Sequence, residues 1–392
     1  MQTTDWIVVG NGIAGAALSY ELAKQGQSVL LIDDANPDSA TRYSYGGIAY
    51  WSGTDDISRT LMAAGIERHR TLSEELGAET EFRELDLLLT IPAGADVDAA
   101  SQPYDKFEIP PRFVSPADAC ELEPQLDKGA IAGALTVKHG HVHPTKLVAA
   151  FNHAFRQMGG RHLISSVTGL VRVGDKVTGV TTPSQAYVGN RVAIATGGYT
   201  RRILQSINIH VPIYHTHAEV VDVSQVDQVD TKIRALIMPA IADRFEAEAK
   251  ASDPEVEPLW QDGPHQIFPP ILDAGVVQFQ DGFTRIGQIS RFNTAVELEV
   301  NAAASAAKMR QAIAQQMPVL SAVSGTWHRC LVTFSRDGLP LLGPVPDLSG
   351  LHLFSGFTSP FAMLLPVAQR FAAWVTGTPD ELIDKMQVSR FV

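Results

Sequence analysis

The chain has 392 residues, of which 45% are hydrophobic and 19% charged, so it is long enough for two domains or one large one. The formal net charge of −12 disfavours nucleic acid and anionic membrane surfaces as partners. Two cysteines, Cys120 and Cys330, form no disulfide framework, so a cytoplasmic protein is expected. The apolar stretch 361–375 is too short, and too interrupted by Pro366 and Arg370, to span a bilayer, so no integral membrane segment is expected.

The N-terminal segment carries the motif on which the rest of the interpretation depends. Ile7–Val9 is a short apolar run without polar alternation, which is typical of a strand covered on both faces. The pattern G-x-G-x-x-G follows at once, with its glycines at Gly10, Gly12 and Gly15. These glycines permit a tight turn, a close approach of the backbone to a pyrophosphate, and close packing of a helix on the strand. The segment therefore predicts a dinucleotide site at a helix N-terminus, where free N–H groups favour phosphates.

The second strand of this unit, 28–32, is followed by Asp33, about 20 residues past the glycines, where an acidic side chain binds ribose hydroxyls. An acid at this position argues against a 2′-phosphate, which leaves FAD or NAD as the ligand. A glycine-rich turn in an unrelated α/β fold is disfavoured, because strand, glycines, helix, second strand and acid all occur in order. The apolar run lacks a basic flank and begins beside Asp5, so it is not expected to be a signal peptide.

Helices and strands alternate along the rest of the chain. Helices are expected at 57–76, from 115 onward, at 146–158, 301–316 and 360–375. Strands are expected at 84–91, 161–166, 176–181, 191–198, 211–223, 275–280, 283–289, 327–334 and 351–358, and strand pairs at 130–142. The segment 96–116 is expected to be irregular, and 243–264 a solvated helix and loop rather than a lid. Because parallel strands that end in small-residue turns define one crevice, distant segments are expected to converge on one cofactor.

Two groups of histidines allow more than one interpretation. Lys138–His143 carries three alternate histidines, which a strand would place on one face, as in a metal site. No carboxylate or cysteine stands at ligand spacing nearby, so a partly exposed strand end is preferred and no metal is expected. In the strand 211–223, His215, His217 and Glu219 share one face, which either is a half-buried sheet face or lines a substrate pocket.

Together these segments resemble the D-amino-acid oxidase superfamily, which includes glycine oxidase and monomeric sarcosine oxidase. The resemblance covers nearly the whole chain and depends on an ordered set of motifs: the glycine motif, 44–48, 140–144, 195–198, Trp327 with 337–344, 355–356 and 390–391. It implies FAD in an extended pose and an α/β fold, with a Rossmann-like FAD-binding domain and a second α+β substrate domain built on a large antiparallel sheet. The FAD-binding domain is expected at 1–80, 140–210 and 325–392, and the substrate domain at 81–139 and 211–324.

The residues expected to contact FAD are those of the matched motifs. They are Gly10, Gly12, Ile13, Ala14, Gly15, Asp33, Asp34, Arg42, Ser44, Gly46, Gly47, Ile48, Val167, Thr196, Gly197, Gly338, Ser355, Gly356, Phe357 and Thr358. Cys330, shortly before Asp337, is similar in position to the cysteine of sarcosine oxidase that bonds the flavin 8α carbon. It is either such a covalent link or a buried structural cysteine, because thiolate reactivity depends on the environment.

The chain departs from the family pattern in the expected substrate pocket. Members that oxidise amino acids carry an arginine shortly after the tryptophan that corresponds to Trp327. This chain has Leu331 or Val332 at that place. Arg329 would share a strand face with Leu331 and is the first candidate to bind a substrate carboxylate. The other candidates are Arg336, Arg285 and Arg291. The usual histidine after the turn at 355–356 is absent, which makes the pocket more apolar.

The resemblance implies an FAD-dependent oxidoreductase that dehydrogenates a small amine or amino acid by hydride transfer to flavin N5, with oxygen or another electron acceptor. Arg329, His217 and His215 are the expected catalytic residues, the histidines for shape and orientation rather than obligatory proton transfer. Two alternatives stay open. One is an FAD-dependent dehydrogenase of the 2-hydroxy-acid type that passes electrons to a quinone or carrier. The other is a flavin-binding protein without turnover.

Overall fold

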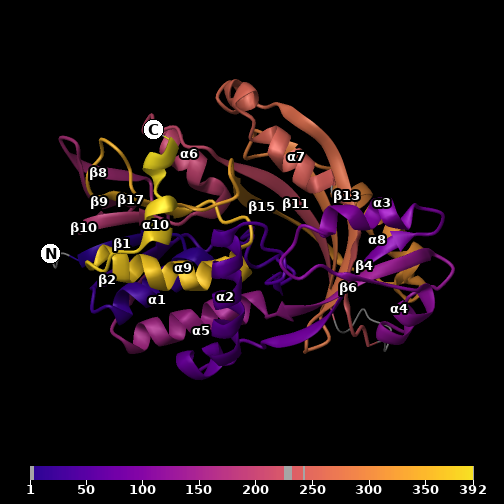
Figure 1. Cartoon of the computed structure of the whole chain (residues 1–392). Helices are drawn as coiled ribbons and strands as arrows, with labels where there is room; N and C mark the ends of the chain where they lie inside the picture. Colours follow the sequence, from indigo (N-terminus) through magenta and orange to yellow (C-terminus); the bar gives the residue numbers. More distant parts are fainter. Residues whose placement is uncertain (1–3, 225–231, 242, 392) are drawn as a thin grey trace.

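Two β-sheets lie side by side and form the frame of the molecule (Figure 1). The computed structural model describes residues 4–224, 232–241 and 243–391. Within these ranges, no helix is long and apolar enough to cross a lipid bilayer. The two sheets confirm the expected α/β fold class with a second, sheet-based half.

The first sheet has eight strands, in the order β16-β17-β10-β1-β2-β7, with β9 pairing to β10 and β8 to β9. Its strands are β1 (Thr4–Val9), β2 (Val29–Asp33), β7 (Arg161–Ile164), β8 (Gly169–Val173), β9 (Lys176–Thr181), β10 (Ala186–Ile194), β16 (Leu341–Pro344) and β17 (Leu351–Ser355). β1 runs parallel to β2 and β10, and β10 runs parallel to β17. The carboxyl ends of these four strands therefore meet at one edge of the sheet, where ligands bind in open α/β folds.

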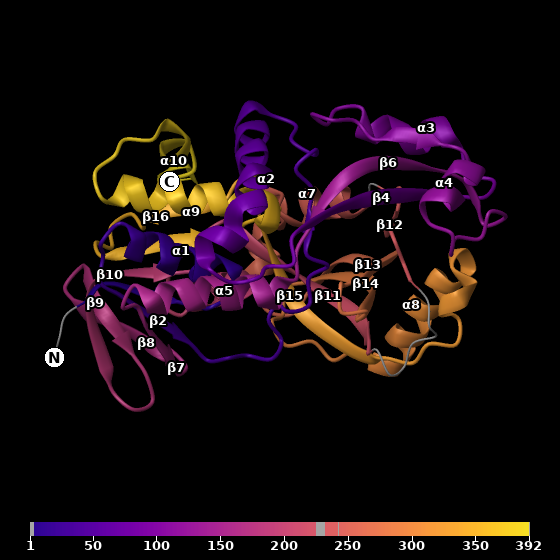
Figure 2. The same cartoon turned by 90° about the horizontal axis from the view of Figure 1, so that it is seen from below.

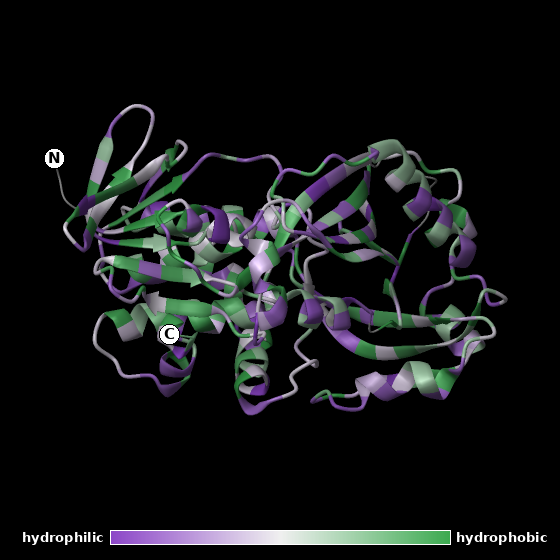
Figure 3. Ribbon diagram, turned by 90° about the horizontal axis from the view of Figure 1, so that it is seen from above, coloured by the Kyte–Doolittle hydropathy of each residue, from purple (hydrophilic) through white to green (hydrophobic). Residues whose placement is uncertain are grey.

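Both faces of this sheet are covered, which explains the apolar run at the start of the chain. Trp6 and Val8 face one core, and the alternate residues Ile7 and Val9 face another. The helices α1 (Ile13–Lys24), α5 (Pro144–Gln157) and α9 (Pro360–Val375) cover the first face, and α6 (Thr200–Gln205) lies on the other side (Figure 1). In Figure 3 the strands of this sheet are mostly hydrophobic.

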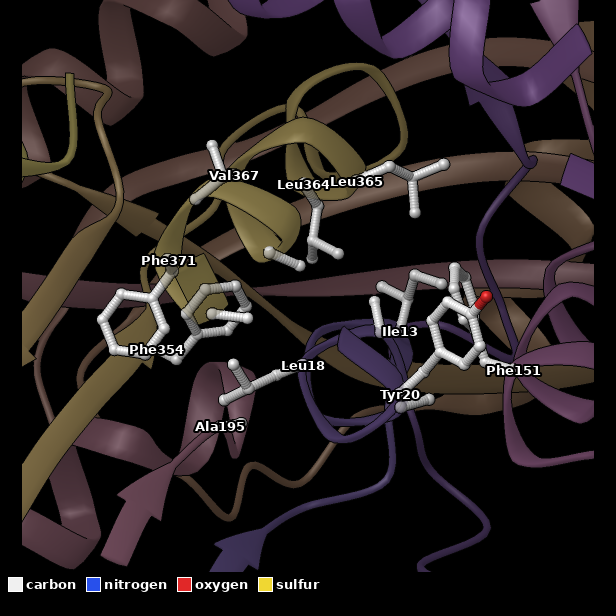
Figure 4. Packing of buried hydrophobic residues seen from close by; sticks show 14 of the residues in the cluster. Ile13, Leu18, Tyr20, Phe151, Ala195, Phe354, Leu364, Leu365, Val367 and Phe371 are labelled. Atoms are coloured by element: carbon white, nitrogen blue, oxygen red, sulfur yellow. The ribbon is translucent and has the colours of Figure 1, made fainter. Parts of the chain in front are cut away.

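The core under α1 and α9 contains two aromatic pairs. Figure 4 shows Phe354 and Phe371 at one end, and Tyr20 and Phe151 at the other. The ring centroids lie 5.3 Å apart in the first pair and 5.6 Å apart in the second. Leu18 of α1 is fully buried in the same cluster. This packing holds the N-terminal turn of α1 in place over the carboxyl edge of the sheet.

The second sheet has nine strands, in the order β15-β11-β14-β13-β12-β4-β6-β3, with β5 pairing to β6. Its strands are β3 (Gly47–Ile48), β4 (Arg83–Pro92), β5 (Arg112–Val114), β6 (Ile131–His141), β11 (Ile213–Val223), β12 (Leu236–Pro239), β13 (Gln266–Gln278), β14 (Thr284–Asn293) and β15 (Thr326–Ser335). Neighbouring strands are antiparallel except β4 and β12, which are parallel. The expected large antiparallel sheet is therefore confirmed with one parallel pair.

Helices lie on both sides of this sheet. α8 (Ala302–Gln316) and α7 (Asp243–Ala251) lie on opposite sides of β13 and β14 (Figure 2). The remaining helices are α2 (Asp56–Leu76), α3 (Val97–Ser101), α4 (Pro116–Leu122) and α10 (Glu381–Lys385). The side of the sheet under α7 faces the ligand-binding edge of the first sheet, as the cavity described below demonstrates.

Three local expectations were wrong. The segment 130–142 is one long strand, β6, rather than strand pairs, because its partner β4 comes from an earlier segment. The segment 96–116, expected to be irregular, contains α3 and β5. The segment 243–264 is not fully solvated, since Ala247, Ala251 and Trp260 are buried against the sheet.

The domain boundaries stay a proposal. Sheet membership differs from them at two strands, because β3 and β15 belong to the second sheet although their residues fall in ranges assigned to the FAD-binding domain. β15 pairs with β11 from Ile213–Ser335 to Asp222–Thr326. This long ladder ties the C-terminal part of the chain to the second sheet.

Candidate functional site

A cavity of about 1050 Å³ lies between the two sheets. The carboxyl ends of the parallel strands contribute Gly10, Asp33, Thr196 and Ser355 to its lining. The second sheet contributes Ala218 and Val220 of β11, Gln288 of β14 and Cys330 of β15. Ligand pockets usually measure roughly 300–1,000 Å³, so this cavity has room for a large ligand.

The glycine turn fits the close approach that the sequence predicts. Gly10 has φ +102, and a Cβ there would lie 2.6 Å from the carbonyl oxygen of Ala195. A Cβ on Gly15 would lie 1.7 Å from the carbonyl oxygen of Gly10. No side chain larger than hydrogen fits at either position without moving the backbone, so both glycines hold α1 tightly against the sheet.

The N-terminus of α1 is open toward the cavity. Gly12 at the N-cap provides no side-chain cap, and the first turn contains no acidic residue. Asn11 lines the cavity, and its buried Oδ1 has no hydrogen-bond partner in the part of the chain that the structure describes. An uncapped helix end with no competing carboxylate suits a pyrophosphate.

Asp33 is held at the end of β2 by two backbone donors. Its Oδ2 accepts a hydrogen bond from the N–H of Asn11 at 2.7 Å, and its Oδ1 accepts one from the N–H of Ala35 at 2.7 Å. Each carboxylate oxygen has a further lone pair, and Asp33 lines the cavity. The carboxylate is therefore oriented to accept hydroxyl groups of a ribose.

A second helix N-terminus meets the cavity at α9. Ser355 at the end of β17 is fixed by a hydrogen bond of 2.7 Å between its Oγ and Oγ1 of Thr200. Thr358 lines the cavity, and its buried Oγ1 has no partner among the described residues. The first turn of α9 has no side-chain cap and no acidic residue. This end of the cavity therefore offers donors and positive polarity to a ligand.

Most residues expected to contact FAD line this cavity. They are Gly10, Gly12, Ile13, Ala14, Asp33, Asp34, Arg42, Ser44, Gly47, Val167, Thr196, Gly197, Cys330, Ser355, Gly356, Phe357 and Thr358. The other four, Gly15, Gly46, Ile48 and Gly338, do not line it. Ile48 is buried in the core under α1, and Gly338 lies in an exposed turn before β16. The contacts with FAD themselves stay predictions.

The expected catalytic residues His215, His217 and Arg329 do not line the cavity. Successive side chains of a strand point to opposite faces, so Ala218 and Val220 face the cavity while His217 faces away from it. Nε2 of His215 and of His217 lies 3.2 Å and 2.7 Å from the carbonyl oxygen of Ala295. Burial lowers the pKa of each histidine to about 4. Both imidazoles are therefore neutral near pH 7 and lie outside the cavity, and their catalytic role stays a prediction.

The four arginines that the sequence offers as carboxylate ligands already have partners. Arg329 donates to the carbonyl oxygen of Leu298, and Arg291 donates to Glu219, which is fully buried. The other two pairs are Arg285 with Asp222, at 2.7 Å, and Arg336 with Glu257, at 3.1 Å. None of the four lines the cavity. The arginines among the described residues that do line it are Arg42, Arg202 and Arg244.

Tyr45, Arg244 and Gln288 are among the cavity residues that were not expected from the sequence. Tyr45 lies next to Ser44 of a matched motif, so its position in the loop was a usable signal. Arg244 lies on α7, in the segment interpreted as solvated, and its place over the sheet depends on the packing of Ala247 and Ala251. Only the tertiary structure brings it to the cavity.

Cys330 is 4% exposed and lines the cavity. Burial raises the pKa of its thiol to about 12. Cys330 lies opposite Ala218 on the neighbouring strand, and its Sγ is 3.8 Å from the carbonyl oxygen of that residue. The thiol is thus placed to contact a ligand, but its surroundings do not favour the reactive thiolate.

The histidines of β6 are more deeply buried than a partly exposed strand end would be. His139 is 6% exposed and His141 is 1% exposed. Nδ1 of His139 accepts a hydrogen bond of 3.0 Å from the indole of Trp51, and Nδ1 of His141 accepts one of 3.4 Å from Arg83. The described residues contain no group of three His, Cys, Asp or Glu side chains that could hold a metal ion.

Comparison with known proteins adds to this geometry. A family model described as FAD dependent oxidoreductase matches residues 5–374. The 4-methylaminobutanoate oxidase (formaldehyde-forming) of Paenarthrobacter nicotinovorans is 23% identical over 98% of this chain and 45% of its own length. The glycine oxidase of Pseudomonas aeruginosa is 23% identical over 96% of each chain. The crystal structure of L-proline dehydrogenase from P. horikoshii superposes with a TM-score of 0.78 and 20% identity, covering 100% of this chain and 98% of the other. This chain thus spans under half of the first relative and nearly all of the second.

Proposed function

Because the chain belongs to the FAD dependent oxidoreductase family, it is an FAD-dependent oxidoreductase, and we propose that it dehydrogenates a small amine or amino acid. The expected family, enzyme class and cofactor are confirmed by this membership. The single observation that carries the proposal is the continuous cavity, which extends from the uncapped N-terminus of α1 to an apolar wall on the second sheet. The two relatives described above act, by their names, on 4-methylaminobutanoate and glycine, which supports a small substrate with an amino group.

The residues present fit FAD. The N-terminus of α1 would hold the pyrophosphate, Asp33 the ribose, and the segment 355–358 the flavin ring edge. When bound, FAD supplies the acceptor for a hydride removed from the substrate carbon next to nitrogen, at flavin N5. The substrate loses that hydride and a proton from nitrogen and becomes an imine.

The wall on the second sheet excludes water from the reacting centre. Ala218, Val220 and Val332 line it with apolar side chains, and Phe357, which follows β17 of the first sheet, also lines the cavity. A dry pocket disfavours a charged ammonium group, so the substrate amine is held in its neutral form with a free lone pair. None of the described residues that line the cavity from the second sheet is a histidine, aspartate or glutamate. The chain therefore needs only to bind and orient the substrate, without a strong general base.

The N–H groups at the start of α9 act on the other side of the pocket. Gly356 and Thr358 line the cavity, and the positive end of the helix dipole is directed at it. This polarity would stabilise negative charge that develops on a bound group as the substrate is oxidised. The role of the chain here is electrostatic and requires no proton transfer.

A substrate screen with an artificial electron acceptor tests the proposal independently of the natural acceptor. Purified holoenzyme is mixed with glycine, proline, N-methyl amino acids and simple methylamines, and with the 2-hydroxy acid that corresponds to each amino acid. Reduction of the acceptor with formation of an imine or its carbonyl product is expected for an amine substrate. Turnover of the 2-hydroxy acids alone would replace the proposal with the alternative dehydrogenase, and no turnover at all would favour the flavin-binding protein. Repeating the assay in oxygenated buffer, with peroxide as the readout, separates oxygen from other acceptors.

A further inference from the structure

Helix α2 holds the first two turns of α9 through their backbone carbonyl groups (Figure 1). Nε2 of His69 donates a hydrogen bond of 2.8 Å to the carbonyl oxygen of Phe361. Nη1 of Arg68 donates one of 3.0 Å to the carbonyl oxygen of Leu365. Phe361 and its neighbour Ala362 line the cavity, whereas Arg68 and His69 do not. The side chains of α2 therefore bind the cavity wall from behind.

The close approach of the two helices depends on Gly65 of α2. A Cβ at this position would lie 1.8 Å from the carbonyl oxygen of Ala362, so only a glycine fits against it. Pro366 of α9 has no N–H group, so this carbonyl oxygen lacks the donor that a regular helix provides four residues later. Gly65, Arg68 and His69 are spaced three and four residues apart, and they form one face of α2 directed at α9.

Arg68 also connects α9 to α1. Its Nη2 pairs with Glu21 of α1 and, at 3.1 Å, with Glu75 of α2. Arg68 and Glu21 are both buried, so the ion pair is shielded from solvent. The N-termini of α1 and α9 both meet the cavity. A single side chain thus links the helix that would hold the pyrophosphate to the helix that would meet the flavin ring edge.

His69 supplies one donor in a fixed orientation. Its side chain is 1% exposed, and burial lowers its pKa to about 4, so the imidazole is neutral near pH 7. Because a carbonyl oxygen only accepts, Nε2 carries the proton of the neutral ring. The ring stacks on Phe82, with 6.0 Å between the ring centroids. Its contact with α9 therefore involves no change of protonation near neutral pH.

The polarity that α9 presents to the cavity depends on where its first turn lies. Among the described residues, no side chain caps this turn, and the turn contains no acidic residue. The positive polarity therefore comes from the backbone N–H groups, and its effect falls off within about one helical turn. A small displacement of the turn would change the electrostatic potential at a bound ring.

On the premise of the proposed function, in which segment 355–358 meets the flavin ring edge, we propose that Arg68 and His69 are positioning residues for the flavin. They hold the N-terminal turn of α9 at the cavity and thereby set how strongly the protein stabilises negative charge on the bound ring. Gly65 contributes by allowing the two helices to approach. All three act through the backbone of α9 and do not touch the ligand.

Sulfite titration of the holoenzyme tests this without an amine substrate. The sulfur lone pair of sulfite adds reversibly to N5 of oxidised flavin, and the negative charge passes to the ring, where positive polarity stabilises it. Loss of the yellow absorbance gives the dissociation constant. His69→Leu removes the donor to Phe361 and is expected to weaken sulfite binding about three- to tenfold in molecules that contain FAD. His69→Gln retains an N–H donor and should stay within about twofold of the unmodified enzyme.

Two further variants disturb the same contact by different means. Gly65→Ala inserts a methyl group against the carbonyl oxygen of Ala362, so α9 must move away from α2. The double variant Arg68→Met with Glu21→Gln removes the donor to Leu365 and leaves no unpaired buried charge. Both should weaken sulfite binding as His69→Leu does.

Two controls separate positioning from general effects on charge and stability. Arg70, the next residue of α2, is exposed and pairs with Glu84 at 2.6 Å, so Arg70→Met changes a charge without touching α9. Ile313 of α8 is fully buried in the core of the second half, so Ile313→Val lowers stability away from α9. Sulfite affinity should be unchanged in both.

The midpoint potential of the bound flavin is the second readout, and it decides the question if the unmodified enzyme forms no sulfite adduct. It should become more negative in His69→Leu and in Gly65→Ala. Unchanged sulfite affinity and midpoint potential in these variants, measured with excess FAD, would overturn the proposal. An equal loss in Ile313→Val would also overturn it, because the effect would then follow stability alone.

The outcome is separable from that of the proposed function, because neither readout requires turnover. If the variants behave as expected but no amine is oxidised, the role of α2 stands and amine oxidation is wrong. If amines are oxidised and the variants leave both readouts unchanged, amine oxidation stands and the role of α2 is wrong.

Discussion

Ala218 and Cys330 lie directly opposite one another on β11 and β15, and both line the cavity. Opposed residues of an antiparallel pair share a face, so these two residues place their face of the sheet against the cavity. The adjacent residues His217 and Glu219 necessarily face the other side, where His217 contacts Ala295 and Glu219 pairs with Arg291. His217 and Glu219 are therefore bonded within the protein, whereas Ala218 and Val220 line the pocket.

Replacement of His217 by glutamine tests this assignment of faces. Glutamine can still donate to the carbonyl oxygen of Ala295, so the fold should be retained. We expect kcat/KM to change by less than about threefold, because His217 faces away from the cavity and does not touch the substrate. Loss of a general acid or base would typically lower the rate by about 10²–10⁴-fold. Steady-state kinetics at several pH values provide the measurement. A hundredfold loss with full FAD content would restore His217 as a catalytic residue.

Replacement of Gly15 by alanine should release the cofactor. The new Cβ would lie 1.7 Å from the carbonyl oxygen of Gly10, so α1 must move away from the glycine turn. We expect FAD content to fall by at least about half and stability to fall by about 1–3 kcal/mol, the usual cost of overpacking. Absorbance ratios of purified protein and denaturant unfolding measure the two effects.

Gly129 provides the matched control for that variant. It meets only Oδ1 of Asp127, at 3.4 Å, and so has ordinary space for a methyl group. Gly129→Ala should retain FAD content and stability. Equal FAD content in the two variants would contradict the close packing described for the N-terminal turn.

The flavin is expected to be bound without a covalent link. Burial raises the pKa of the Cys330 thiol to about 12, so very little of the nucleophilic thiolate is present near neutral pH. Acid precipitation of the holoenzyme should therefore leave the yellow colour in the supernatant, and Cys330→Ser should behave identically. A yellow pellet that becomes colourless in Cys330→Ser would instead establish a covalent bond at this cysteine.

The N-terminal unit could be predicted in detail because its signals are local. Gly10 and Asp33 are read from a strand, a turn and a helix that follow each other directly in sequence, and the structure has all three. The strand 211–223 was predicted, but its alternation shows only that His215 and His217 share a face. Which face meets the ligand depends on the partner strand β15 and on α7, which come from distant segments.

The position of Arg244 at the cavity also depends on distant segments and could not be predicted from the sequence. The segment around it is rich in charge, and Ala247 and Ala251, which are buried against the sheet, are small residues that give a weak hydrophobic signal in the sequence. The four arginines chosen from the sequence were near the expected strands, but each has an acidic or carbonyl partner that sequence spacing does not show. Pairing across the fold, rather than residue type, decides which arginine is free.

Anaerobic mixing of the holoenzyme with an N-methyl amino acid shows whether the bound flavin takes electrons from an amine. The absorbance of the bound flavin reports electron transfer without any external acceptor, so the measurement concerns only the substrate and this site. Complete bleaching of the flavin by the N-methyl amino acid is expected. Flavin that stays oxidised with every amine but is bleached by a 2-hydroxy acid would overturn the proposed amine oxidation.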